Sequence, residues 1–412
     1  MFNINSDHRA LATVLIASAL LSTPSISAQN SPDQAPASRV VRSAYQATTV
    51  VSPVPGDPAA SGQALRKAIS NLSPEPNSGF RWLVKIEPGT YDLGDTSLAM
   101  RQYVDIEGAG LAATILRGNV GPESGAAARE DLGGDSLVAG DPEPSMANLN
   151  QGLIEGASNA ELRLLTVECV ATAAQPACMA MLNENVSPRL KNLRLRVTEP
   201  SLGSHWGIRN YNATPVLDHV EIEVSGAQNG DNYGLVNVGE GFMTIIDLRN
   251  STIAVHGAEA TNNWAVLNRR YAKVHPVLNS SLSANGGYHA AGLVYTDPGV
   301  TGDFYVQHST ITATGGAGDS IGINQFDSDD DTVRPIVQFS SISGDTHGIL
   351  MSYNNPVVVE DSELYGSQFA VSAGHVNLTR TWIRGGDIFG ALSETCTDVE
   401  DPSHTNFPNT CP

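Results

Sequence analysis

The chain has 412 residues, and its 23 lysines and arginines stand against 43 aspartates and glutamates, which gives a formal net charge of -20. A surface of this sign repels the phosphates of nucleic acids and the headgroups of anionic lipids, so we predict no nucleic-acid partner. The 39 glycines, the 23 prolines and an aromatic content of 6% favour a fold rich in turns over a helical core.

The first residues have the pattern of a secretory signal peptide. His8 and Arg9 precede an apolar run over 11–21, and small residues follow it. We therefore predict a signal peptide over 1–28, a polar linker over 29–48, and a protein that is secreted, periplasmic or held at the cell surface. No later segment contains the roughly 20 apolar residues of a spanning helix, so we predict no membrane span.

An N-terminal cap and the first strands are expected over 49–118. Leu65, Ile69 and Leu72 have helical spacing after Ser61, the candidate N-cap. This helix is expected to cover one open end of a stack of strands, because exposed strand edges promote aggregation. The segments "WLVKIEPGTYDLG", "LAMRQYVDIEGAG" and "ATILRG" then predict strands separated by turns.

A repeat organises residues 151–390, after a segment over 119–150 whose Gly, Pro, Glu and Asp content predicts a surface loop. Each repeat has an apolar residue, an apolar residue or Ser at +3, a branched residue or Leu at +5, and a small residue at +7. The +5 positions are Val167, Leu195, Ile222, Ile253, Leu282, Ile311, Ile342, Leu364 and Ile383. A shorter motif, such as "GIRN" or "GLVN", precedes most repeats. Units this short cannot bury an apolar face alone, so the pattern predicts a β-solenoid in which each unit forms one coil.

Equivalent positions of the repeat are expected to lie above one another in such a stack. Two polar columns follow: Asn183, Asn210, Asn237 and Asn268, and Ser251, Ser280, Ser309, Ser340 and Ser362. We expect the asparagine amides to bond along the stack. Outward charges alternate, because Glu168, Arg196 and Glu223 share one column. Arg194 and Glu221 share the next, and pairs of this kind contribute about 0.2–1 kcal/mol each.

Residues 80–118 and the repeats that follow resemble the pectin-lyase-like superfamily, most closely its uncharacterised secreted members with Gly-Ile-x-Asn repeats. The resemblance extends to about residue 390. It implies an all-β fold, a right-handed parallel β-helix with an N-terminal helical cap, followed by a disulfide-closed C-terminal cap over 391–412. This fold hosts lyases, hydrolases, esterases, adhesins and inert scaffolds, so it does not imply one activity.

The four cysteines lie in two close pairs, Cys169 with Cys178 and Cys396 with Cys411. Their even number and their proximity favour two local disulfides, as expected in an exported protein, although four cysteines allow three connectivities. A zinc site is the rival interpretation, and no histidine or cysteine at zinc-like spacing supports it.

The motif "GDTHG" contains Asp345 and His347, which resemble an acid/base pair. The motif recurs as "GDNYG", "GDSIG" and "GDIFG", so we interpret it as a turn followed by one ring of a stack inside the coil. The other rings of that column are Trp206, Tyr233, Trp264, Phe369 and Phe389. In "GDIFG", Asp387 resembles the nucleophile of pectinesterases, but the flanking elements of that family are missing. No catalytic residue is assigned.

The densest acidic cluster is "DSDDD". Asp327, Asp329 and Asp331 alternate, so one face could present three carboxylates to calcium, a cation that prefers oxygen ligands. A solvated loop is the competing interpretation, and we prefer it. We expect no required cofactor, with calcium as an optional ligand.

These observations predict a secreted, monomeric, non-catalytic protein that binds extracellular or envelope polysaccharide or serves as a cell-surface scaffold. The alternative is a polysaccharide lyase or glycoside hydrolase that acts on extracellular polysaccharide, uronate-containing chains included, with its residues scattered over several coils. Outward aromatic and basic side chains on one face favour glycan recognition, whereas burial of every Trp and Tyr favours a scaffold.

Overall fold

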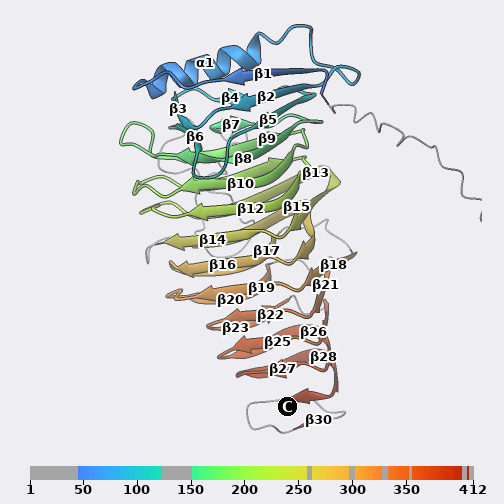
Figure 1. Cartoon of the computed structure of the whole chain (residues 1–412). Helices are drawn as coiled ribbons and strands as arrows, with labels where there is room; N and C mark the ends of the chain where they lie inside the picture. Colours follow the sequence, from blue (N-terminus) through green and yellow to red (C-terminus); the bar gives the residue numbers. More distant parts are fainter. Residues whose placement is uncertain are drawn as a thin grey trace, which may run out of the picture. The chain divides into compact units, whose positions relative to one another are not determined.

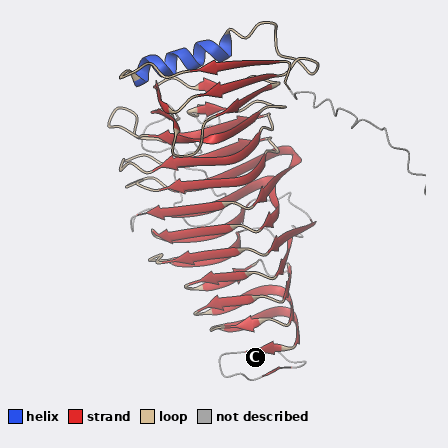
Figure 2. Ribbon diagram, viewed as in Figure 1, coloured by secondary structure: helices blue, strands red, loops and turns tan. Residues whose placement is uncertain are grey.

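The computed structural model describes residues 45–122, 151–257, 262–296, 302–326, 333–351, 355–400 and 406–407. Within them, the chain forms one helix and a stack of strands (Figure 1, Figure 2). Successive units pair in parallel, and only the last pair of strands is antiparallel in the described part. The all-β class and the parallel stacking implied by the resemblance are confirmed. The predicted signal peptide, most of the linker over 29–48 and most of the loop over 119–150 lie outside the described residues.

The strands form three parallel ladders. Ladder A contains β4 (Leu98–Ala99), β7 (Ile154–Glu155), β9 (Cys178–Glu184), β11 (His205–Tyr211), the first parts of β13 (Asn232–Arg249) and β15 (Asn262–Leu278), β17 (His289–Thr296), β20 (Asp319–Phe326), β23 (His347–Leu350), and the first parts of β26 (Phe369–Thr379) and β28 (Asp387–Thr397).

Ladder B contains β1 (Ala47–Val51), β2 (Trp82–Ile86), β5 (Val104–Glu107), the first parts of β8 (Glu161–Cys169), β10 (Arg189–Val197) and β12 (Val216–Val224), the second parts of β13 and β15, β18 (Gly302–Gln307), β21 (Val333–Gln338), β24 (Pro356–Glu360), and the second parts of β26 and β28.

Ladder C contains β3 (Gly89–Gly94), β6 (Thr114–Gly118), the second parts of β8, β10 and β12, β14 (Thr252–Gly257), β16 (Ser281–Gly286), β19 (Thr310–Thr314), β22 (Ser341–Gly344), β25 (Glu363–Gly366), β27 (Trp382–Ile383) and β29 (Val399–Glu400). The last strand, β30 (Asn406–Phe407), pairs with β29.

The predicted helix is present as α1 (Pro58–Ser70), but its N-cap is Asp57 rather than Ser61. The Asp57 carboxylate accepts a hydrogen bond of 2.9 Å from the backbone of the first turn. Pro58 follows at the first helical position, where a missing N–H costs nothing. Ser61 lies inside the helix, and its hydroxyl accepts a hydrogen bond from the Val54 N–H instead. In Figure 1, α1 lies over the first strands of the stack; its protective role as a cap remains a prediction. No helix in the described part of the chain is long and apolar enough to span a membrane.

Two apolar clusters lie on opposite sides of ladder A. The larger cluster contains residues of all three ladders and fills the inside of the stack, whereas the smaller one contains Trp206, Tyr233 and Trp264. Ile208, which follows Trp206 after a single glycine, belongs to the larger cluster. The prediction of rings inside the coil is therefore wrong for Trp206, Tyr233 and Trp264, because they belong to the smaller cluster and not to the one that Ile208 joins.

The asparagine column is confirmed. Asn183 donates through its side-chain amide to Asn210 at 2.7 Å, and Asn210 donates in turn to Asn237 at 2.8 Å. The next bond joins Asn237 to Asn268 at 2.9 Å. These amides are buried, so they have lost their hydrogen bonds to water. Each bond along the column replaces one of those lost bonds and avoids the cost of an unpaired buried polar group.

The serine and charge columns are also present. From Ser251 to Ser362, each backbone N–H donates to the hydroxyl of the next serine of the column at 3.1 or 3.2 Å. Arg194 pairs with Glu221 at 2.8 Å. Arg196 pairs with Glu223 at 3.0 Å on the neighbouring column. The repeat positions therefore correspond to physical columns of contacts.

The strand stack extends past the predicted end at residue 390. Residues 393–397 of β28 pair with 375–379 of β26. Within this pairing, Cys396 lies on Leu378, and both side chains belong to the buried core. Strand pairing therefore continues into the predicted C-terminal cap over 391–412, whose role as a cap remains a prediction. Cys396 is disulfide-bonded, and its expected partner Cys411 lies outside the described residues. At the other end, β1 begins at Ala47, inside the predicted linker.

Candidate functional site

An open groove runs along the corner where ladder B turns into ladder C, in the C-terminal half of the chain. It has a volume of about 800 Å³ and is lined by His308, Ser309, Thr310, Phe339, Ser340, Ser341, Asp361, Ser362, Glu363, Arg380 and Trp382. These residues belong to successive coils, so the groove crosses the strands. We refer to it as the corner groove.

At this corner the chain turns through one residue with positive φ in each coil. From β8 onward these residues are Leu164, Asn192, His219, Asn250, Asn279, His308, Phe339, Asp361, Arg380 and Asp398. Asparagine tolerates this left-handed conformation well, whereas a bulky side chain in it is an outlier that costs about 1–2 kcal/mol. Phe339 has a φ of 51° and is 55% exposed. A residue that is both strained and apolar on the surface contributes little to folding, which points to a function.

Aromatic rings occupy both ends of the corner groove. The Phe339 ring stacks on that of His308 in the preceding coil, with centroids 5.1 Å apart and an interplanar angle of 6°. Trp382 lies further along the stack and is 40% exposed. The guanidinium of Arg384 lies 4.9 Å from the centre of the Trp382 ring. The groove therefore presents several large rings to solvent on one corner of the stack, and it is grouped rather than single exposed apolar side chains that mark a binding site.

The charged side chains of the groove are paired. The Arg380 guanidinium donates two hydrogen bonds of 2.6 Å to the two carboxylate oxygens of Asp361. These bonds lower the pKa of Asp361 below its usual value. Arg384 lies 2.5 Å from the carboxylate of Glu363. Asp361 is therefore ionised at neutral pH and is unsuited to act as a general acid.

The floor of the groove is the serine column. The hydroxyls of Ser309, Ser340 and Ser362 donate to backbone carbonyl oxygens two residues earlier, at 2.8, 2.7 and 2.6 Å. Their donors are thus used within the fold. Thr310 and Ser341 stand beside this floor in adjacent coils and pair in register. Among the described contacts their hydroxyls make no hydrogen bond, so they are available to a ligand.

The predicted calcium ligands are the three alternating aspartates of "DSDDD". Asp327, Asp329 and Asp331 lie outside the described residues. Across the ranges that are described, no group of three or more His, Cys, Asp or Glu side chains is arranged to hold a metal ion. The calcium site remains a prediction.

The "GDTHG" motif is a structural turn. Asp345 accepts a hydrogen bond of 2.6 Å from the Gly315 N–H in the preceding coil. The His347 ring stacks on Phe369 with centroids 5.7 Å apart, and burial lowers the pKa of His347. No hydrogen bond or ion pair joins Asp345 to His347 within the described part, so the acid/base interpretation finds no support.

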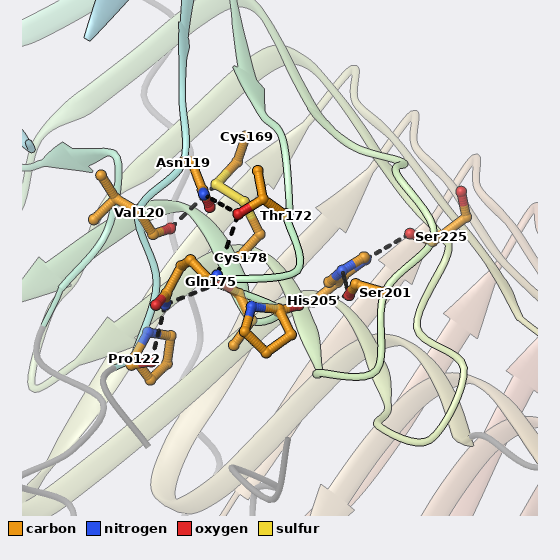
Figure 3. The surroundings of a disulfide bond; sticks show 12 residues. Asn119, Val120, Pro122, Cys169, Thr172, Gln175, Cys178, Ser201, His205 and Ser225 are labelled. Atoms are coloured by element: carbon orange, nitrogen blue, oxygen red, sulfur yellow. Dashed lines mark hydrogen bonds between the residues drawn. A yellow bond between two sulfur atoms is a disulfide. The ribbon is translucent and has the colours of Figure 1, made fainter. Parts of the chain in front are cut away.

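The predicted disulfide between Cys169 and Cys178 is confirmed. Figure 3 shows that the loop it closes is also held by side-chain hydrogen bonds, including one of 2.8 Å from Asn119 to Thr172. Gln175 donates to the carbonyl oxygen of Pro122 at 3.1 Å. The cross-link therefore strengthens the junction between the early coils and the repeats.

A buried serine–histidine pair lies next to this loop (Figure 3). His205 Nε2 lies 2.8 Å from Ser201 Oγ, and His205 Nδ1 lies 2.6 Å from the carbonyl oxygen of Ser225. The arrangement resembles a nucleophile with its base. However, His205 is 0% exposed, and the Ser201 hydroxyl donates to the Pro176 carbonyl. The pair joins three loops and is closed to a polymeric substrate. Sequence reasoning missed it because the equivalent residues of the neighbouring coils, Cys178 and Asn232, are not histidines, so the repeat gave no signal.

The best described candidate for a catalytic base is Lys273 on β15. Its ammonium donates to the Asp303 carbonyl oxygen at 3.2 Å, and burial lowers its pKa. The neighbouring His275 ring lies 5.3 Å from that of Tyr305. A lysine with a lowered pKa suits proton abstraction. Lys273 is only 7% exposed, however, so a polysaccharide cannot reach it in this structure.

One buried and three half-buried histidines predict a specific pH dependence of stability. Burial is the first cause of a lowered pKa for His205, His275, His289 and His347. The folded state therefore favours the neutral rings, whereas unfolded histidines bind a proton near pH 6.5. We expect the melting temperature to be constant above about pH 7 and to fall as the pH drops from 6.5 to 5. Calorimetry at these pH values checks this, and a maximum near pH 5 would contradict it.

No family model and no curated protein matches the chain. Similar solved structures include the Dettilon tailspike protein, with 10% identity and a TM-score of 0.47 over 86% of this chain and 63% of that chain. A mannuronan C-5 epimerase A-module from Azotobacter vinelandii has 13% identity and a TM-score of 0.41 over 83% of this chain and 95% of its own. The pectin methylesterase from Yersinia enterocolitica has 13% identity and a TM-score of 0.34 over 66% and 88%. This chain spans less than two thirds of the tailspike, and at such identities no activity follows.

Sequence reasoning also missed the corner groove, although a signal was present. The corner residue is the third residue of the repeat, where Asn and His recur, and "VQFSSISG" carries Phe339 at that position. A phenylalanine at a position where asparagine, aspartate and histidine recur was a detectable anomaly, which Leu164 and Arg380 share. The exposure of the ring and its stacking on His308 required the structure.

Proposed function

We propose that this chain is an exported, right-handed parallel β-helix protein that binds extracellular or envelope polysaccharide through its corner groove, without cleaving it. The observation that carries the proposal is Phe339, a strained and exposed ring at a left-handed corner that asparagine occupies in three other coils. The Cys169–Cys178 disulfide supports export, because disulfides persist in oxidising compartments.

Stacked rings suit sugars because the C–H faces of a pyranose are apolar and carry partial positive charge. Such faces pack on the negative face of an aromatic ring. Phe339 and Trp382 supply rings, and the hydroxyls of Thr310 and Ser341 supply hydrogen-bonding partners for sugar hydroxyls. This combination of rings and a few polar groups is typical of a ligand site.

The electrostatics of the groove support binding over hydrolysis. A glycoside hydrolase requires one carboxyl group that is protonated near neutral pH and a second that is ionised. In the groove, Arg380 lowers the pKa of Asp361, and Arg384 pairs with Glu363. Both carboxylates are engaged by guanidinium groups, and the lowered pKa of Asp361 makes it unsuited to donate a proton to a glycosidic oxygen.

The substitution Phe339→Asn tests this proposal. It removes the ring and introduces the residue found at the same corner in other coils, such as Asn250 and Asn279. We expect glycan affinity to fall by at least about tenfold, because a stacked, buried ring contributes about 1–2 kcal/mol. We also expect the free energy of unfolding to rise by about 1 kcal/mol, because the left-handed strain is relieved. Affinity electrophoresis against a polysaccharide panel and urea unfolding measure the two effects.

Tyr288→Asn provides the matched control. Tyr288 is a 51% exposed ring between β16 and β17 that does not line the groove, so its removal should leave glycan affinity unchanged. Equal losses in both variants, or no binding by the wild-type protein, would refute the proposal. Depolymerisation of any panel member, with calcium or with chelator, would favour the lyase or hydrolase alternative instead.

A further inference from the structure

Resting on the proposed function, we infer that the corner groove binds an uncharged polysaccharide strand that runs along the axis of the stack, across successive coils. This assigns both a chemical class and a direction to the ligand.

The direction follows from the placement of the rings. His308 and Phe339 stack in one column, and Ser341, Glu363 and Trp382 follow one another in register in the next column. Strands in a sheet lie about 4.8 Å apart, so the three steps from His308 to the coil of Trp382 span roughly 14 Å. A chain along this axis meets all three rings. A chain laid along one strand would meet a single ring.

The chemical class follows from the pairing of charges. Arg380 is held by two hydrogen bonds to Asp361, and Arg384 pairs with Glu363. A uronate or sulfate group would have to break one of these pairs to gain a cation. A cationic amino sugar would have to break the same pairs to gain a carboxylate. Neutral hydroxyls require neither exchange, because Thr310 and Ser341 offer hydrogen bonds without desolvating a charge pair.

The charge of the whole protein favours the same class of ligand. The formal net charge is -20, so a polyanion approaches against a repulsive potential at moderate ionic strength. The affinity for a neutral polysaccharide is not reduced by this repulsion. We therefore expect binding to a neutral glycan to change less than twofold between 50 mM and 500 mM NaCl.

The inference predicts that one substitution gives the protein a new ability, which is to bind acidic glycans. Asp361→Asn removes the partner of Arg380 and leaves a residue that tolerates the positive φ of 47° at this corner. The groove then contains an unpaired guanidinium, which suits carboxylate recognition. We expect this variant to acquire salt-sensitive binding to alginate or polygalacturonate, at least about tenfold above wild type in 50 mM NaCl.

The experiment compares wild type, Phe339→Asn and Asp361→Asn on β-glucan, galactomannan, xylan, alginate and polygalacturonate at the two salt concentrations. Salt-insensitive binding of a neutral glycan that depends on Phe339 supports the inference. Binding of wild type to the acidic glycans alone, still dependent on Phe339, would overturn the neutral class and leave the proposed function intact. Binding that is absent, or indifferent to Phe339→Asn, would overturn the proposed function itself.

Discussion

Replacing Asn210 by Asp is expected to destabilise the protein by about 3–5 kcal/mol, although the two side chains have nearly the same shape. Asn210 is 1% exposed, accepts a hydrogen bond from Asn183 and donates one to Asn237. A carboxylate at this position keeps the first bond and loses the second, and two oxygens then face each other. The loss equals that of an uncompensated buried charge. Urea unfolding at pH 7 measures it.

The pH dependence of this variant has a defined sign. Burial raises the pKa of the introduced carboxyl above its unfolded value of about 3.9, so its penalty is present at neutral pH and shrinks as the pH falls toward 4. A protonated carboxyl can again donate to Asn237. Asn159→Asp is the control, because Asn159 is an exposed left-handed residue and Asp tolerates that conformation. Equal stabilities of the two variants at pH 7 would show that the asparagine column does not stabilise the stack.

Gly62→Ala is expected to displace α1 and to cost about 3 kcal/mol. A Cβ at Gly62 would lie 1.9 Å from the carbonyl oxygen of Asp92 in β3, which is closer than any contact that side-chain flexibility could relieve. Backbone atoms would have to move, and overpacking of this kind costs about 1–3 kcal/mol or more. Alanine is about 1 kcal/mol more favourable than glycine inside a helix, so helix propensity alone would stabilise the variant. A net loss of unfolding free energy must therefore come from the packing clash.

The measurement combines urea unfolding with hydrogen exchange of the α1 amides. Arg66 donates to the Leu93 carbonyl at 2.8 Å, and Leu65 is buried in the core, so both contacts should weaken when the helix moves. If α1 protects the end of the stack, the variant also self-associates, which light scattering detects. Gly79→Ala is the matched control, since the nearest atom to its Cβ is 3.4 Å away. Identical behaviour of both variants would refute the packing argument and the capping role.

The columns of the stack could be predicted because a repeat fold relates contacts to sequence in a simple way. Each coil is translated by one strand spacing, so residues at equivalent repeat positions become neighbours. This is why the asparagine bonds from Asn183 to Asn268 and the Arg196–Glu223 pair could be inferred from alignment of the repeats. The same logic identified His347 as a repeat position rather than a catalytic base.

The side of a strand on which a column lies was less predictable. Side chains alternate across a strand, but Gly207 interrupts the alternation, so Trp206 and Ile208 belong to different clusters. The prediction therefore placed the rings on the wrong side. The helix start at Asp57 was missed for a local reason, because the Asp-Pro sequence before α1 was a stronger signal than Ser61.

The sequence by itself determined the parallel stack, the polar columns and one disulfide, because these depend on spacing along the chain. Only the tertiary structure decided where a ligand could bind. The corner groove joins residues up to 74 positions apart, from His308 to Trp382, and its character depends on three properties that the sequence does not encode locally. These are the positive φ of Phe339, the exposure of its ring and the pairing of Arg380 with Asp361. Each arises only when successive coils come into contact, because the neighbours that set it come from other turns of the stack.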